Sequence, residues 1–367
     1  MRNAAVATYG HRRRATGARA VSALSVCRRF GLSGFLTSAV AVLAVAAPWI
    51  FSPYTLYLAT LAAVYAFGAI AVNLATGYIG ILSLAPAGFY AVGAYSAAVV
   101  GPHAGDDLIV VSGAAIVISA VLALVLALPV LRLKGIYLAI ATFAFALVVQ
   151  RIIVALDDIT GGNVGKSIGT LKVVGWVVPN PTSLYFTVVV VLAIGLVFSF
   201  LLRSSASGRA MFMVRSDEAG AAVAGVNARR LKAVAFVLAS VYCAVGGVLY
   251  GYVVGFVSPS NFDILLTIQF LAMAVIGGLA RPAGPLIGSM FVVIVPSVLS
   301  AFQTWIPAVY GALIIVVILL MPGGIAGLGA QLGGALGRWR ASHAPPSPEE
   351  DAEASSSLSI TEKKAVR

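Results

Sequence analysis

The segment of this chain that most resembles a catalytic motif is Gly161 to Ser167, which reads Gly-Gly-Asn-Val-Gly-Lys-Ser. A glycine-rich loop that ends in Gly-Lys-Ser can wrap a nucleotide phosphate with backbone N–H groups, if four residues separate its first glycine from the Gly-Lys pair. Only three residues separate Gly161 from Gly165, and the preceding position is Thr160. The spacing excludes a phosphate-binding loop, so we expect no nucleotide site in this chain.

The chain also has few cysteine and histidine residues that could bind a metal or take part in hydrolysis. The two cysteines lie apart, Cys27 in a basic leader and Cys243 in an apolar run, and His11, His103 and His343 lie in charged or Gly/Pro-rich segments. These positions predict no disulfide framework, no metal site and no Ser-His-Asp arrangement. We therefore expect no catalytic residue and no cofactor; a membrane enzyme stays open as a third interpretation, to be tested by turnover of the purified chain.

The composition indicates the secondary-structure elements that must position these polar residues. The chain is 60% hydrophobic and 10% charged, whereas soluble proteins carry about 25% charged residues. Apolar runs of this kind are long enough to cross a hydrocarbon core of about 30 Å as helices, and they lack the alternation of barrel strands. The sequence predicts an all-α polytopic membrane protein with about ten transmembrane helices. The ten runs are 32–51, 54–74, 79–100, 108–131, 136–156, 184–202, 233–256, 264–279, 285–303 and 308–321.

The distribution of charge predicts the topology. Seven arginines precede the first run, and the positive-inside rule therefore places the N-terminus in the cytoplasm. Later basic residues fall in alternate loops, which puts both termini inside, and acidic residues dominate the external loops. The net charge of +12 is thus explained by topology, and no nucleic-acid partner is expected because a basic patch interleaved with aromatic residues is absent.

The distribution of apolar and charged residues divides the chain into four parts. Residues 1–31 form a basic cytoplasmic leader, and 32–322 form the transmembrane domain, with a long cytoplasmic loop at 203–232. Residues 323–340 are expected to form an interfacial helix, and 341–367, rich in Pro, Ser, Ala and Glu, a disordered cytoplasmic tail.

Ionisable residues are almost absent from the predicted spans, although ion-coupled transporters commonly carry them there. Gln150 and Arg151, near the end of the fifth run, are the only strongly polar pair. Arg151 is interpreted first as snorkelling to the interface beside Asp157 and Asp158. The energy for any transport is therefore expected to come from another protein.

The loop at 203–232 is the best candidate for the surface that such a protein contacts. Ser216 is a plausible N-cap, Asp217 and Glu218 follow where a helix dipole favours acids, and Gly225 is placed to end the helix after Ala224. We predict a short partner-binding helix between basic flanks, with these residues, Arg209 and Arg215 at the docking surface. A solvated loop is the alternative.

Small residues recur every four positions in the following span, a spacing that lets helix backbones approach closely. This predicts helix packing at Ala239, Cys243, Gly247, Gly251 and Gly255, and again at Gly284 and Gly288.

Several motifs, in order from about 70 to 325, together resemble the permease subunits of ABC importers for branched-chain amino acids, of the LivM/LivH kind, with LivM the better match. The motif at 131–142 favours LivM; Pro86 and Ala280-Arg281-Pro282 depart from the usual pattern. The matching segments are 73–84, 87–95, 131–142, 160–162, 207–227, 255–259, 277–279 and 284–288.

The resemblance implies a type II ABC importer-like permease in the bacterial plasma membrane. It implies a second homologous permease subunit, two cytoplasmic ATPases that carry the ATP and Mg, and an extracytoplasmic substrate-binding protein. Related permeases carry urea, short amides or sugars, so these substrates stay open, and an ion-coupled carrier or channel is the runner-up. Polar residues in or beside the matching spans could line the pathway or could join helices: Asn73, Ser83, Tyr137, Thr142 and Gln150.

Overall fold

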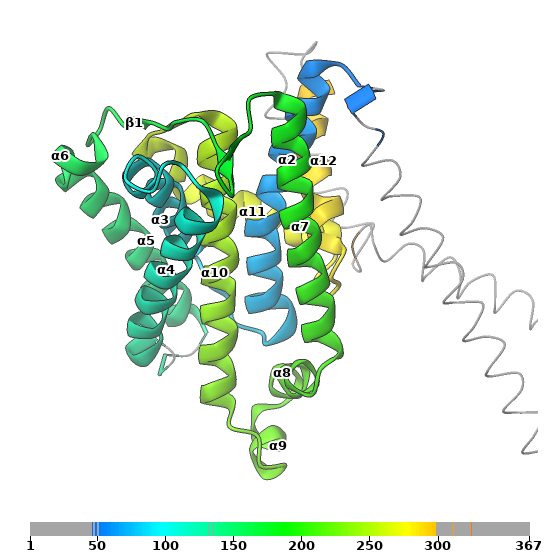
Figure 1. Ribbon diagram of the computed structural model, residues 1–367. Coiled ribbons are helices and arrows are strands. Elements are labelled where there is room, and N and C mark those ends of the chain that lie inside the picture. The colour runs from blue at the N-terminus through cyan, green and yellow to red at the C-terminus, as the bar shows by residue number, and fades with distance from the viewer. Residues whose placement is uncertain are drawn as a thin grey trace, which may run out of the picture.

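The computed structural model describes residues 46, 48, 49, 51–130, 132, 133, 135–298, 311 and 324. The leader, the interfacial helix, the tail and almost all of the predicted runs 32–51 and 308–321 lie outside these residues. The described part is mostly helical (Figure 1). Its helices are α2 (Pro53–Val72), η1 (Asn73–Tyr78), α3 (Pro86–Val100), α4 (Leu108–Val130), α5 (Ile136–Ala155), α6 (Asp157–Thr160), α7 (Pro181–Ser204), α8 (Ala206–Ser216), α9 (Glu218–Val223), α10 (Ala228–Val254), η2 (Pro259–Phe262), α11 (Ile264–Gly277) and α12 (Gly284–Val298).

Five helices of the described part are long and apolar enough to cross a membrane: α2 continued by η1, α4, α5, α7 and α10. Three apolar helices, α3, α11 and α12, are shorter, with 15, 14 and 15 residues. At about 1.5 Å per residue, α3 extends only about 22 Å. The expectation of one continuous span over 79–100 is wrong in its first third, because the helix begins at Pro86.

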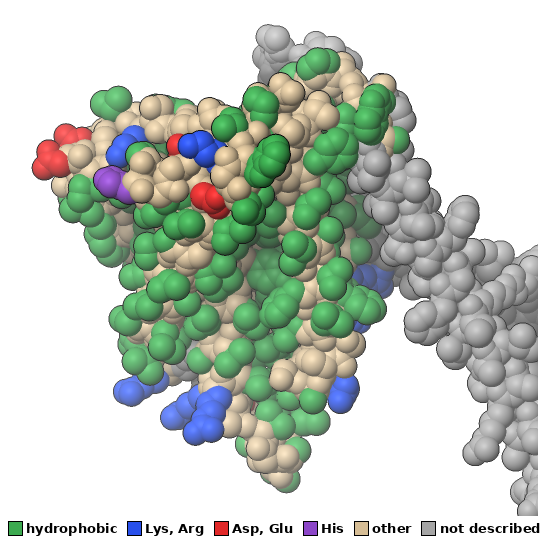
Figure 2. All heavy atoms as spheres, viewed as in Figure 1, with side chains coloured by type: hydrophobic (Ala, Val, Ile, Leu, Met, Phe, Trp, Pro, Cys, Tyr) green, Lys and Arg blue, Asp and Glu red, His purple; other side chains and the backbone are tan. Residues whose placement is uncertain are grey.

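The bundle is built around α2 and α10, which are largely buried. α10 packs against α3, α4 and α2, and α12 packs against α2 and α11. Most residues of the outer helices α4, α5 and α7 are not buried, many of their apolar side chains are exposed, and Figure 2 shows hydrophobic side chains over the sides of the bundle. Such a surface suits a lipid bilayer or a second membrane subunit.

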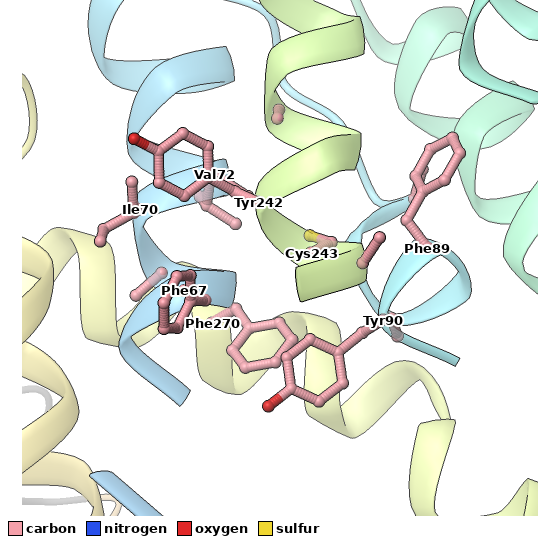
Figure 3. Close-up of a cluster of buried hydrophobic side chains, with 14 of the residues drawn as sticks. Phe67, Ile70, Val72, Phe89, Tyr90, Tyr242, Cys243 and Phe270 are labelled. Carbon is pink, nitrogen blue, oxygen red and sulfur yellow. The ribbon is translucent and has the colours of Figure 1, made fainter. Parts of the chain in front are cut away.

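Aromatic side chains fill the centre of the bundle (Figure 3). The rings of Tyr90 on α3 and Phe270 on α11 lie 5.0 Å apart between centroids, and Phe67 on α2 lies 6.3 Å from Tyr242 on α10. Cys243 is buried beside them on α10. This cluster joins the neighbouring helices α2 and α3 to α10 and α11, which lie much later in the sequence.

Glycine contacts bring α3 and α10 unusually close. A Cβ on Gly247 would collide with the carbonyl oxygen of Tyr90, and a Cβ on Gly93 would collide with the carbonyl of Ala244. Gly251 lies against Ile168 and Ala97. Each helix thus uses a glycine to admit the backbone of the other. Ala239 and Cys243, on the same helix, are also buried.

A second close approach joins α11 and α12. A Cβ on Gly284 would meet the backbone of Gly277 and Gly278, and one on Gly288 would meet the carbonyl of Met273. The backbones of these helices are therefore in contact without intervening side chains.

Gly255 does not take part in such packing, which corrects the expectation from its spacing. It is the C-cap of α10 with a φ of 75°, and no atom lies within 4 Å of the position its Cβ would take. A glycine is needed at this position because the backbone that ends the helix is left-handed.

The two ends of the bundle differ. One end carries α8 and α9, and basic side chains gather there (Figure 2). The opposite end carries α6, acidic side chains and four two-residue strands, β1 (Lys166–Ser167), β2 (Lys172–Val173), β3 (Trp176–Val177) and β4 (Phe256–Val257). β1 pairs with β4 and β2 with β3, both antiparallel. These short pairs are an addition to the expected all-α fold.

Candidate functional site

The helical path of the chain is interrupted between α2 and α3. η1 is a π-helix, and residues 79–85 form no helix. Gly80 adopts a φ of 78°, and the N–H of Ile81 donates to the carbonyl of Ala75 at 2.7 Å. Irregular backbone at membrane depth must be enclosed by protein or line a water-filled cavity, and Ile79, Ile81 and Ala85 are indeed buried. π-turns and broken helices of this kind are frequent at functional sites.

Hydroxyl groups satisfy the free N–H groups where α3 begins. The N–H of Leu84 donates to Oγ1 of Thr142 on α5 at 2.9 Å, and that of Ala87 donates to Oγ1 of Thr267 on α11 at 3.1 Å. Ser83 accepts from the N–H of Ala85 at 3.3 Å. The first N–H groups of a helix lack partners within it, so two neighbouring helices complete this buried start.

Asn73 connects the interruption to a second one, between α11 and α12. Its Oδ1 accepts from the N–H of Ala280 at 2.7 Å, and its Nδ2 donates to the carbonyl of Arg281 at 2.9 Å. Ala280 has a φ of 65°, a conformation that alanine rarely adopts. The Asn73 side chain thus holds a strained turn in place.

The structure distributes the five predicted pathway residues among different settings. Asn73 and Thr142 are buried and use their polar groups to join helices. Ser83 is buried at the start of α3, whereas Tyr137 is 69% exposed. Gln150 donates to the carbonyl of Pro259 at 3.0 Å. The geometry of Asn73 and Thr142 matches the helix-joining alternative; a role of these five in transport stays a prediction.

A cavity of about 10 Å³ lies beside the interruption and is lined by Ser83, Ser240 and Cys243 among others. This space is no larger than a single water molecule requires. An amino acid could not be held there in this conformation, so a pathway for one would have to open elsewhere or by movement.

A larger pocket of about 250 Å³ lies at the end with α6 and the strands. It is lined by Gln150, Arg151, Val154, Asn163, Ser258, Pro259 and Ser260. Within the described part of the chain, no carboxylate lies within the ion-pairing distance of 4.0 Å from Arg151. The expected position of Arg151 beside Asp157 and Asp158 therefore involves no ion pair.

The predicted docking loop contains two helices in place of one. α8 (Ala206–Ser216) begins at Ser205, whose Oγ accepts from the N–H of Gly208 at 3.1 Å. α9 (Glu218–Val223) is capped by Asp217, whose Oδ1 accepts from the N–H of Ala219 at 2.9 Å. The N-cap is thus Asp217, which corrects the assignment to Ser216, because Ser216 ends α8. The sequence analysis did not predict the preceding helix, α8.

Gly225 follows α9 with a φ of 79°, the left-handed conformation that commonly ends a helix. Ala224, the C-cap of α9, and Gly225 are both exposed. Glu218 pairs with Lys232 at 2.7 Å, so it links α9 to the second turn of α10.

The two arginines of the predicted docking surface behave differently. Arg209 is exposed and its Nη1 donates to the carbonyl of Ser204 at 2.8 Å. The guanidinium of Arg215 instead reaches the carbonyl of Gly77 in η1. Arg215 is exposed as a whole, but its guanidinium contacts a residue 138 positions away, which no local pattern indicates. The contacts of Thr267 and Ala280 also join distant positions, so the sequence analysis did not identify these two residues.

Comparison with known proteins agrees with this architecture. Residues 54–322 match the model of the branched-chain amino acid transport system / permease component family. The chain is 29% identical over 312 residues to the high-affinity branched-chain amino acid transport system permease protein LivM of Escherichia coli (strain K12), covering 78% of this chain and 73% of that protein. It is 28% identical over 298 residues to the corresponding LivH of the same strain, covering 73% of this chain and 92% of that protein.

No solved structure matches the chain significantly. The family model alone covers well over half of the chain, from α2 to beyond α12. The chain therefore belongs to the permease component family of branched-chain amino acid transport systems.

Proposed function

We propose that this chain is the transmembrane permease subunit of an ATP-driven importer of branched-chain amino acids, located in the bacterial inner membrane. The family match and the names of the relatives support the activity. The five long apolar helices support a multi-pass membrane protein. Ten spans with both termini in the cytoplasm complete the proposed topology.

The observation that carries the coupling to ATP is the tip of α9. Val223 is 92% exposed, and α9 stands beyond the ends of the long helices (Figure 1). Basic residues surround this end, which the positive-inside rule assigns to the cytoplasm. Three neighbouring apolar residues, Ala222, Val223 and Ala224, are exposed at this projecting tip, which suits contact with another protein, and we assign that contact to a cytoplasmic ATPase.

Two ATPases, which bind the ATP and Mg, would dock on this subunit and on a second homologous permease. The cavity beside the interruption is too small for an amino acid, which supports a pathway that runs between the two permeases and not through this part of the bundle. An extracytoplasmic binding protein would deliver substrate to the opposite end, where the pocket beside Gln150 lies.

The pocket favours an amino acid over urea, short amides or sugars, the alternative substrates. Arg151 offers a guanidinium without a carboxylate partner among the described residues, and arginine is well suited to bind a carboxylate. Urea, amides and sugars lack such a group. An ion-coupled carrier or channel is the remaining alternative class.

The test is to purify the tagged chain from native membranes in mild detergent and to identify its partners. We expect a second permease and P-loop ATPases, with vanadate-sensitive ATP hydrolysis, and uptake of labelled leucine by cells. If the chain is purified alone and moves solute in reconstituted vesicles, the proposal is wrong and a carrier or channel takes its place.

A further inference from the structure

Arg215, near the end of α8, directs its side chain toward η1. Its Nη1 donates to the carbonyl of Gly77, and its Cγ lies 3.1 Å from the position that a Cβ on Gly80 would take. The aliphatic part of the side chain thus lies over Gly80, whose missing side chain makes the approach possible. The contact joins the docking helices to the interruption between α2 and α3.

The carbonyl of Gly77 is a suitable acceptor for a cation. It lies one residue before the end of η1, and the last carbonyl groups of a helix lack partners within it and carry partial negative charge. A guanidinium at this point donates a hydrogen bond to the carbonyl oxygen and offsets its partial negative charge.

η1 is also tied to other helices. Asn73, at its start, holds the turn before α12 through Ala280 and Arg281. Tyr78, at its end, lies 3.3 Å from Ser199 of α7 between hydroxyl oxygens and contacts the ring of Phe212 on α8. A movement of α8 would therefore reach η1 through two side chains and the α11–α12 turn through Asn73.

The π conformation of η1 gives it a discrete alternative. A π turn holds one residue more than an α turn, so conversion to α geometry would rotate the residues beyond it by about 100° about the helix axis. Such a rotation moves Gly77 relative to Asn73. The contact of Gly77 with Arg215 and the contacts of Asn73 with the turn before α12 cannot both be kept. The Arg215 contact consequently favours the π state.

We propose that Arg215 is a positioning residue that couples movement of α8 and α9 to the conformation of η1, and through Asn73 to the turn between α11 and α12. This inference rests on the proposed function, in which α8 and α9 contact an ATPase. Arg215 would then act within the subunit, and its removal would separate ATP hydrolysis from transport without detaching the ATPases.

The experiment compares the full complex carrying Arg215→Met, Arg215→Lys or, as the control, Arg132→Met. Arg132 is exposed, two residues after the end of α4, and lies outside the 203–232 loop. Three quantities are measured for each: the amount of ATPase that is purified with the chain, its ATP hydrolysis, and uptake of labelled leucine by cells in which the variant is the only copy. Thermal unfolding of the purified complex reports folding defects.

For Arg215→Met we expect normal amounts of ATPase and normal hydrolysis, but leucine uptake per ATP reduced about tenfold, an effect of the size usual for coupling between sites. Arg215→Lys should recover part of this ratio because it keeps a charged donor, and Arg132→Met should leave the ratio unchanged. If Arg215→Met does not fold, Arg215→Gln replaces it, with a smaller head group that cannot span the same distance.

An unchanged uptake per ATP in a folded Arg215→Met complex would overturn the inference. So would loss of the ATPases from that complex, because Arg215 would then be a docking residue. Failure of the proposed function is recognised separately, since in that case the unaltered chain would be purified without any ATPase.

Discussion

The side chain of Asn73 and the backbone of Ala280 are joined across the bundle: Oδ1 of Asn73 accepts from the N–H of Ala280 at 2.7 Å. Nδ2 of the same amide donates to the carbonyl of Arg281, so both the oxygen and the nitrogen of the side-chain amide form hydrogen bonds. Because Ala280 has a φ of 65°, the hydrogen bonds hold a backbone conformation that its side chain disfavours. The two interruptions of the helical path, at 79–85 and 278–283, are thereby connected.

Asn73→Ala should destabilise the protein, because it leaves the N–H of Ala280 and the carbonyl of Arg281 without this partner. We expect a loss of about 1–3 kcal/mol in the free energy of unfolding, the usual cost of an unsatisfied buried polar group. Denaturant titration of the purified protein in detergent measures it. Asn163→Ala is the control, since Asn163 is exposed at the opposite end, and equal stability of the two variants would contradict the prediction.

Thr142 tests whether a predicted pathway residue has a structural role. Thr142→Val keeps the shape of the side chain but removes the acceptor for the N–H of Leu84, and we expect it to cost about 1–3 kcal/mol of stability. Thr142→Ser keeps the hydroxyl and should be close to the unaltered protein in stability and in the KM for leucine uptake. A changed KM in a stable Thr142→Ser protein would instead favour contact with substrate.

Gly247→Ala should force α3 and α10 apart, because the added Cβ collides with the carbonyl oxygen of Tyr90. Overpacking of this kind typically costs about 1–3 kcal/mol, and a lower melting temperature would report it. Gly113→Ala is the matched control on α4: no atom lies within 4 Å of its Cβ position. Alanine there should be neutral or stabilising by up to about 1 kcal/mol; a similar loss in both variants would refute close packing at Gly247.

Val223→Asp should weaken ATPase docking, because it places a charge on the exposed tip of α9. An unpaired carboxylate that is buried in an interface costs several kcal/mol, so we expect much less ATPase to be purified with the chain. Val164→Asp makes the same change at the opposite end, where Val164 is 82% exposed, and should leave the ATPase bound. Full ATPase recovery with Val223→Asp would place the docking surface elsewhere.

The local patterns predicted most of the helices. Apolar runs such as 108–131 and 136–156 correspond closely to α4 and α5, because a helix that faces lipid or protein must be apolar over its whole length. Glu218 and Gly225 were correctly placed in the first turn and just after the end of a short helix, although its N-cap is Asp217 and not Ser216, since caps act on the backbone within a few residues. The pattern failed over 79–85, where apolar residues form buried irregular backbone.

The positions that join the helices required the tertiary structure. The spacing of small residues selected both Gly247 and Gly255, yet only Gly247 meets a neighbouring backbone, because contact depends on which helix lies opposite. Likewise, an arginine in a basic loop looks the same whether it faces solvent, as Arg209 does, or reaches Gly77, as Arg215 does.

The sequence by itself thus determined what each segment can be: membrane-crossing by hydropathy, and ended by capping residues. These properties depend on neighbouring residues and on the solvent. Only the tertiary structure decided which polar groups satisfy one another, as Asn73 and Ala280 do across 207 positions. A polar group in an apolar surrounding must find some partner, but packing of the whole bundle selects which one.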